Sequence, residues 1–132
     1  MLGTTARLLA TALIGAAASV GCVSADAISP DRADAERAAI QHDLRNDTAT
    51  LCKIASERAK RGKSELRGRQ VVCAIADIQT TFKSETHAVH TISYACGIAP
   101  WQPNKAPAVA TPKVVLDLLK EGRGIWMING FL

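Results

Sequence analysis

The sequence predicts an α+β protein in which an N-terminal helix, or a pair of helices, packs on a four-stranded antiparallel sheet. Three observations lead to this prediction. Apolar residues recur at helical spacing between residues 30 and 62. From residue 70 the chain becomes rich in β-branched and apolar residues, arranged as two pairs of strands around polar or glycine turns. Only 4% of the 132 residues are aromatic, so aliphatic side chains and alanine must supply most of the core.

The first residues predict an export signal. Met1–Arg7 carries one positive side chain, Leu8–Val20 is small or apolar throughout, and further small residues follow. The 13 residues of Leu8–Val20 are fewer than the ~20 that a membrane-spanning helix needs. We therefore expect residues 1–27 to be a signal peptide and residues 28–132 to form a single α+β domain.

Two cleavage positions are open. Small residues in Ala25–Ala27 fit a signal peptidase and would give a mature chain that begins at Ile28. Ala18–Cys22 instead resembles a bacterial lipobox, which would make residues 1–21 the leader and place a lipid anchor on Cys22. Both alternatives predict an exported protein, either periplasmic or lipid-anchored to the cell envelope.

Ser29, Pro30 and Asp31 predict the start of the helical region. Ser29 can cap free main-chain N–H groups, Pro30 lacks an N–H of its own, and Asp31 complements the positive helix end. An apolar stripe follows along one face, made by Ile40, Leu44, Leu51, Ile54 and Ala55. Residues 46–48 can break or recap the helix, so the sequence allows one long helix or two nearly collinear ones that end near Gly62.

Two hairpins are predicted after the helices. Val71–Phe82 and Ala88–Ile98 have strand composition and flank the polar turn Lys83–Thr86. Val114–Leu119 and Ile125–Ile128 form the second pair, around a turn whose glycines supply positive φ.

The register of the first hairpin predicts which cysteines form a disulfide. If its turn is centred between Ser84 and Glu85, Cys73 and Cys96 lie equally far from the centre and face each other, as a disulfide requires. Closing this loop of 24 residues would stabilise the fold by about 3 kcal/mol. The alternative is a bond from Cys52 on the helix to either strand cysteine. No pair has C-x-x-C spacing, which argues against a redox site or a zinc knuckle.

The net charge of +4 is concentrated in one segment, Lys53–Arg69, which alone carries +5. In an exported protein this segment is either a solvated helix end and loop or a surface that binds an envelope protein, an anionic lipid or a glycan, and not nucleic acid. The predicted partner-binding residues there are Lys53, Arg58, Lys60, Arg61, Lys63, Arg67 and Arg69. Trp101 is a further candidate because it lies in a proline-rich loop, Gly97–Pro112. It is either an exposed anchor for a partner or a side chain folded back over the core.

Other chemistry is not predicted. His87 and His90 are three residues apart on a strand, so they point to opposite faces and cannot chelate one ion. Gly62-Lys63-Ser64 lacks the upstream glycine and strand of a phosphate-binding loop. We therefore expect no metal and no cofactor.

The end of the chain resembles a known fold class. The stretch VVLDLLKEGRGIWMINGF, within Lys113–Leu132, resembles the final strand pair of many small exported proteins with nuclear transport factor two-like or cystatin-like folds. In those proteins an apolar strand, a charged glycine turn and an Ile-Trp-x-Ile strand end the domain. Met127 stands where they often carry Lys or Arg. The resemblance implies helices followed by a curved antiparallel sheet.

Two classes of function follow. We expect a non-enzymatic interaction module of the bacterial cell envelope, with inhibitors and immunity-type proteins included in that class. The alternative, implied by isomerases of the resembling superfamily, is a small-molecule-binding or isomerase-like enzyme with a sheet-lined cavity. Asp77 or His90 would be its base and Tyr94 its hydrogen-bond donor. Because a fold does not fix an activity, a pocket holding these residues would favour the enzyme and a filled sheet face would favour the module.

Overall fold

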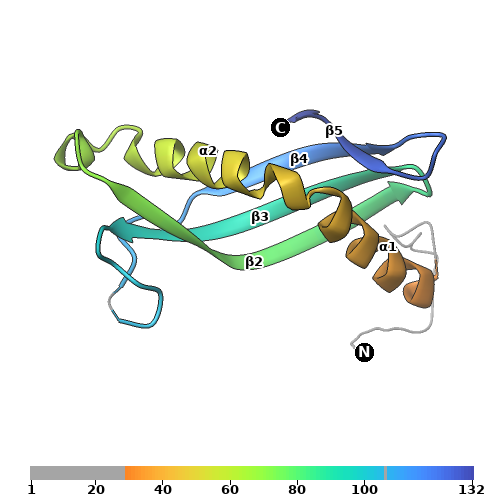
Figure 1. Cartoon of the computed structure of the whole chain (residues 1–132), viewed down its shortest axis with the longest axis horizontal. Coiled ribbons are helices and arrows are strands. Elements are labelled where there is room, and N and C mark those ends of the chain that lie inside the picture. The colour runs from red at the N-terminus through yellow and green to blue at the C-terminus, as the bar shows by residue number, and fades with distance from the viewer. Residues whose placement is uncertain (1–28, 106) are drawn as a thin grey trace, which may run out of the picture.

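The computed structural model describes residues 29–105 and 107–132. These residues form a four-stranded antiparallel sheet and two α-helices, which confirms the α+β class (Figure 1). The predicted signal peptide and the lipidation candidate Cys22 lie outside the described residues. Neither helix is long and apolar enough to cross a membrane, as far as the described residues go.

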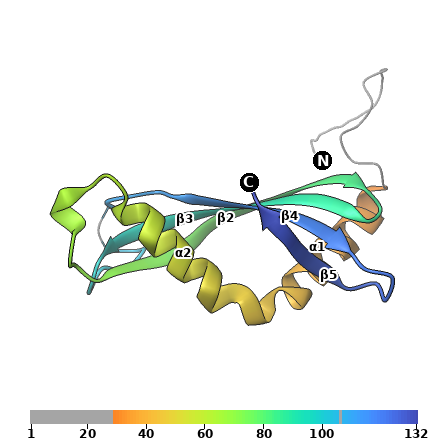
Figure 2. The same ribbon diagram turned by 90° about the horizontal axis from the view of Figure 1, so that it is seen from above.

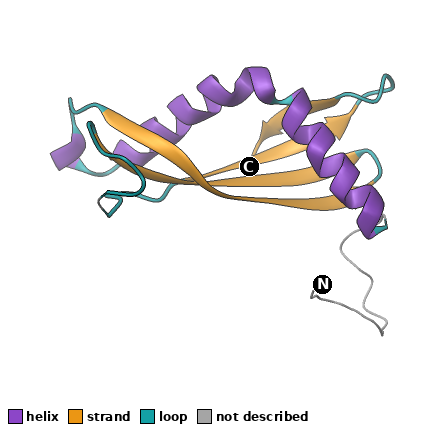
Figure 3. Cartoon of the chain, turned by 60° about the horizontal axis from the view of Figure 1, so that its bottom comes forward, coloured by secondary structure: helices purple, strands orange, loops and turns teal. Residues whose placement is uncertain are grey.

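The helical region is divided in two. Helix α1 (Pro30–Asp43) begins at the predicted proline, and the Ser29 hydroxyl accepts a hydrogen bond from the Arg32 main-chain N–H at 3.4 Å. A 3-10 turn, η2 (Arg45–Asp47), leads into α2 (Thr48–Lys60), and a second short turn, η3 (Ser64–Leu66), precedes the sheet. Figures 2 and 3 show that α1 and α2 meet at a bend, so the expectation of one long helix or a collinear pair is wrong.

The sheet contains β2 (Val71–Ser84), β3 (His87–Ile98), β4 (Lys113–Lys120) and β5 (Trp126–Phe131), in that order and all antiparallel. Strands β2 and β5 are therefore its edges. Both helices lie on one face of the sheet (Figure 3). Side chains of β3 alternate between buried and half-buried, because alternate residues point to the helices and to the uncovered face.

The core lies between the helices and this face. The apolar stripe of the helices supplies four of its members: Ile40 and Ala55 are fully buried, and Leu44 and Leu51 nearly so. The strands supply the large side chains, and the Phe82 and Trp126 rings pack with their centroids 6.0 Å apart. The buried strand residues are Val71, Phe82, Ala88, Ile92, Tyr94, Cys96, Val114, Leu116, Leu118 and Trp126.

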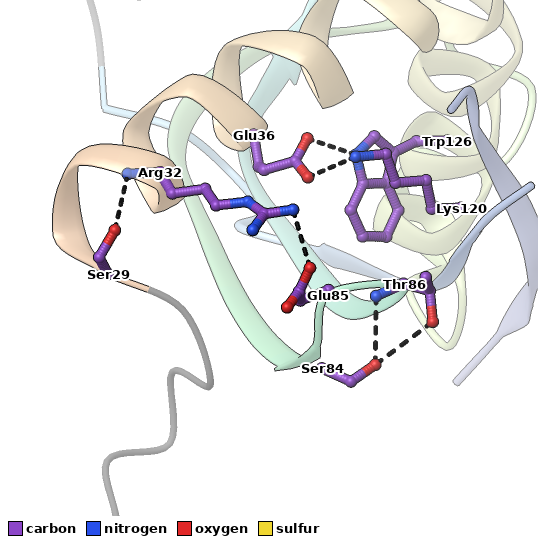
Figure 4. Close-up of polar contacts among 8 residues, drawn as sticks. All are labelled: Ser29, Arg32, Glu36, Ser84, Glu85, Thr86, Lys120 and Trp126. Carbon is purple, nitrogen blue, oxygen red and sulfur yellow. Dashed lines mark hydrogen bonds and ion pairs between the residues drawn. The ribbon is translucent and has the colours of Figure 1, made fainter. Parts of the chain in front are cut away.

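Helix α1 is attached to the β4–β5 hairpin by a polar cluster around Glu36 (Figure 4). The Glu36 carboxylate accepts from Lys120 Nζ at 2.5 Å and from Trp126 Nε1 at 3.3 Å. Burial alone would raise the pKa of Glu36, but the hydrogen bonds from Lys120 and Trp126 and the positive charges of Lys120 and Arg32 outweigh it and lower this pKa. Glu36 is therefore ionised and fully paired at neutral pH.

The first hairpin reaches the predicted cysteine pairing by a different route. Glu85 and Thr86 form the turn, so its centre lies one residue further along the chain than expected. Two bulges in β2, between Ile75 and Asp77 and between Phe82 and Ser84, each insert one extra residue. Together they restore the expected register, and Cys73 lies opposite Cys96.

Candidate functional site

Most of the basic segment lies at one end of the molecule, where α2 ends and the chain turns through η3 into β2 (left in Figure 1), and Lys53 lies earlier on α2. Gly62 and Gly68, on either side of η3, have the positive φ that lets the chain reverse there. Four of them are exposed, namely Lys53, Arg61, Arg67 and Arg69, and the others are half-buried.

Two of the seven predicted residues have a structural task. Arg58 Nη1 donates to the Lys113 main-chain oxygen at 2.8 Å, and Lys63 Nζ donates to the Val109 oxygen at 2.9 Å. The first contact joins α2 to the start of β4, and the second joins the turn after α2 to the segment between β3 and β4. The side chains of the other five make no hydrogen bond or ion pair within the described part of the chain. These five, Lys53, Lys60, Arg61, Arg67 and Arg69, are called the basic surface below.

The proline-rich loop lies at the same end of the molecule. It returns beside β3, where Val109 N–H donates to the Cys96 oxygen at 2.8 Å and Tyr94 N–H donates to the Pro112 oxygen at 2.9 Å. Trp101 is half-buried and folds back on Gly97, because a Cβ placed on Gly97 would lie only 2.1 Å from Trp101 Cγ. The structure thus brings Trp101 and the basic segment to one end, with Trp101 packed on β3; its contact with a partner stays a prediction.

The cysteines show the predicted bond. Cys73 and Cys96 form a disulfide between β2 and β3, and Cys52 on α2 is a free thiol. The Cys52 S–H points to the Cys73 main-chain oxygen at 3.7 Å, so the thiol lies close to the disulfide without taking part in it. The disulfide fixes the β2–β3 pair directly beside the basic end.

The three residues of the enzyme alternative do not converge. Asp77 is exposed beside a bulge of β2, opposite Ser93 on the uncovered face. His90 and Tyr94 point to the helices and are 3% and 2% exposed. Burial lowers the pKa of His90, whose Nδ1 shares a 2.8 Å hydrogen bond with Thr80 Oγ1. Burial, with a smaller effect of the Cys52 charge, raises the pKa of Tyr94.

The helix-facing side of the sheet is packed with core side chains, among them Tyr94, whereas Asp77 lies on the uncovered face. His87 and His90 lie on opposite faces, as the strand geometry predicts. Within residues 29–105 and 107–132, no group of three histidine, cysteine or acidic side chains is placed to hold a metal ion.

A polar cluster on the uncovered face was not anticipated. His87 Nε2 donates to Asp117 Oδ1 at 2.5 Å, and Asn129 Nδ2 donates to Asp117 Oδ2 at 2.9 Å. The hydrogen bonds from Asn129 and His87 lower the pKa of Asp117. The three residues come from three strands, so only the strand register could have shown that they meet. The cluster links β3, β4 and β5 across this face.

A groove at the other end of the molecule was also missed. It lies between the junction of the two helices and β5, with a volume of about 470 Å³, and Asp43, Asp47 and Glu121 are among its lining residues. Its walls are more than seventy residues apart in sequence, so no local pattern could reveal it.

Comparisons with known proteins found no relative of this chain. No protein-family model, no curated protein and no solved structure matches the chain. The residues described above therefore define the class by themselves: an α+β domain with a disulfide-braced, strongly basic end.

Proposed function

We propose that this protein is an exported, non-enzymatic interaction module of the bacterial cell envelope that binds an acidic partner through its basic surface. One observation carries the proposal: of five cationic side chains without partners in the described structure, four lie where α2 ends and the chain turns into β2, and the fifth, Lys53, lies earlier on α2. A merely solvated helix end would not need Arg58 and Lys63 to attach it to the start of β4 and to the β3–β4 loop. A fastened charged surface is better suited to recognition, because less order is lost on binding.

The partner follows from the charge. Clustered lysine and arginine attract carboxylates, phosphates and sulfates, so the candidates are an acidic envelope protein, an anionic lipid or an anionic glycan. Under the export hypothesis, lipidation at Cys22 would hold the domain at a membrane, whereas cleavage before Ile28 would leave it free in the periplasm. Nucleic acid is not an expected partner in that compartment.

The resemblance to the nuclear transport factor two-like and cystatin-like classes belongs to the same proposal. Two helices followed by an antiparallel sheet are the arrangement that the resemblance implies, and we propose that the chain shares that fold as a helix pair packed on the sheet. The separation of Asp77 from His90 and Tyr94, and the filled helix-facing side of the sheet, support the binding module over an isomerase-like enzyme.

Vesicles containing anionic phospholipid and soluble polyglutamate serve as probes, with neutral phosphatidylcholine vesicles as the reference. We expect binding to the polyanions alone. Raising the salt from about 0.1 M to about 1 M shortens the Debye length from about 10 Å to about 3 Å and should release the protein.

Matched variants locate the surface. Arg61→Glu/Arg67→Glu should abolish binding without unfolding the domain, since both side chains are exposed and make no hydrogen bond or ion pair within the described chain. Lys83→Glu/Arg123→Glu makes the same change of net charge at exposed positions away from the basic end and should retain most of the binding. Equal loss in the two variants, or binding that ignores salt, would refute the proposal.

A further inference from the structure

Strand β5 is an edge strand whose outer side is not paired with another strand among the described residues. The Trp126 main-chain N–H points away from β4 and donates to Asp43 Oδ2 at 2.9 Å. The neighbouring Ile125 oxygen points inward, between the two arms of the hairpin, and accepts from Glu121 N–H at 2.9 Å. Because main-chain groups alternate along an antiparallel strand, the N–H and C=O of Ile128 also point outward. They are free to pair with an added strand.

The groove described above lies along this outer side. Asp43, Leu44 and Asp47, from the junction of the helices, form one wall, and Trp126–Ile128 form the other. The Asp43 carboxylate already fills the position that the carbonyl of a neighbouring strand would occupy at Trp126. The space that remains, beside Ile128, has the position and the hydrogen-bonding direction needed for one more strand.

Side chains around the groove indicate which side chains the added strand should have. Ile125 and Met127 are 45% and 46% exposed, so they offer apolar contact. Three carboxylates line the groove, from Asp43, Asp47 and Glu121, against the single guanidinium of Arg123. The carboxylates of Asp47 and Glu121 have no partner within the described chain. Apolar and cationic side chains on an incoming peptide would complement this surface.

We propose that β5 and the groove beside it bind an extended segment of another protein that combines apolar with lysine or arginine side chains, by adding it as a strand to the sheet. A second copy of this chain is a poorer occupant, because β5 paired with β5 would bring two acidic rims together. The other edge is less suited, since two bulges interrupt β2, against one in β5 at Asn129. The β4–β5 turn beside the groove lies at the opposite end of the sheet from the turn that joins α2 to β2, and the proposal does not depend on the proposed function (Figures 1 and 2).

A ten-residue peptide of alternating valine and lysine tests the site by NMR. Binding should shift the β5 amide signals and protect the Ile128 N–H from hydrogen exchange. An alternating valine and glutamate peptide should leave the β5 amides unchanged. Asp47→Lys/Glu121→Lys should weaken binding of the lysine peptide about tenfold, as expected for two partly exposed charge pairs turned repulsive.

The matched control is Glu57→Lys/Asp77→Lys, which makes the same change of net charge at exposed positions away from the groove and should bind like the wild type. Three results would overturn the proposal: no protection at β5, equal binding of both peptides at β5, or equal weakening by the two double variants. Concentration-dependent protection of Ile128 without peptide would instead show that a second copy occupies the edge, and would overturn it as well. All readouts are at β5, so failure of the basic surface cannot imitate them.

Discussion

At the scale of single residues, the contact between Gly97 and Trp101 decides how the proline-rich loop is held. A Cβ at Gly97 would come within 2.1 to 2.6 Å of three Trp101 atoms, a distance at which the ring must move. Gly97 has no positive φ, so the effect of Gly97→Ala isolates this overlap from backbone strain. Because Trp101 packs on Gly97, its side chain is half-buried and not fully exposed to a partner.

We expect Gly97→Ala to lower the free energy of unfolding by about 1–3 kcal/mol, the usual cost of overpacking. Gly122→Ala is the control, because a Cβ there meets nothing within 4 Å. Urea denaturation of both variants measures the difference. In a Trp101→Ala background the cost of Gly97→Ala should shrink; a cost that stays the same would show that the ring is not the obstacle.

Because of His90, the free energy of unfolding should depend on pH, and the direction of the change can be predicted. Burial lowers its pKa in the folded state below the ordinary value near 6.5, so the unfolded chain binds the proton more tightly. The stability contributed by neutral His90 is complete above about pH 6.5 and falls as the pH drops towards the folded-state pKa. The slope is at most about 1.4 kcal/mol per pH unit for one proton.

The measurement compares denaturation midpoints between pH 7.5 and 5. The wild type should lose stability over this range, and His90→Gln should lose less. His42→Gln, at an exposed position on α1, should behave like the wild type. The lowered pKa values of Glu36 and Asp117 affect stability only at lower pH, because carboxylates in an unfolded chain take up protons only near pH 4. A His90→Gln curve parallel to that of the wild type would contradict the assignment.

At the scale of elements, the sequence predicts strands better than their junctions. Composition alone locates both hairpins, because β-branched runs need a sheet to cover them. The two bulges in β2 and the exact turn at Glu85–Thr86 depend on how β2 twists across the helices, which no local pattern records. The cysteine register was therefore predicted correctly although the turn was misplaced by one residue. The bend at η2 was likewise visible only as a helix-breaking segment, since its angle follows from packing on the sheet.

The disulfide is the element-scale feature with the largest expected energy. Cys73→Ser/Cys96→Ser, made in a Cys52→Ser background to prevent new pairing, should lower the free energy of unfolding by about 3 kcal/mol in the chain-entropy model. Equilibrium denaturation against Cys52→Ser alone measures the loss. Cys52→Ser itself should have a small effect, because its thiol makes only one long contact, at 3.7 Å. Near-equal stabilities of the single and triple variants would argue that the hairpin does not need the bond.

At the scale of the whole molecule, the two ends differ in charge. The basic surface was predictable because its residues all lie within Lys53–Arg69, so the composition of that one segment reveals the excess. The acidic groove was not, because Asp43 and Glu121 come together only when α1 folds back over the β4–β5 hairpin. The sequence also could not show which of the seven basic residues are free, since Arg58 and Lys63 bind main-chain oxygens of Lys113 and Val109, about fifty residues further along the chain.

The last prediction concerns the mature chain. Ser29 caps α1 and Pro30 begins it, so a start at either Ile28 or Cys22 retains the whole described fold. Intact-mass measurement of the protein from an envelope fraction should therefore give the mass of residues 28–132, or that of residues 22–132 with lipid attached. In either form the disulfide lowers the mass by two hydrogens. Alkylation under denaturing, non-reducing conditions should add a single label, at Cys52, because Cys73 and Cys96 are bonded and Cys22 is either removed or acylated. A chain that keeps Met1 would contradict export, and a label on Cys73 or Cys96 would contradict the pairing.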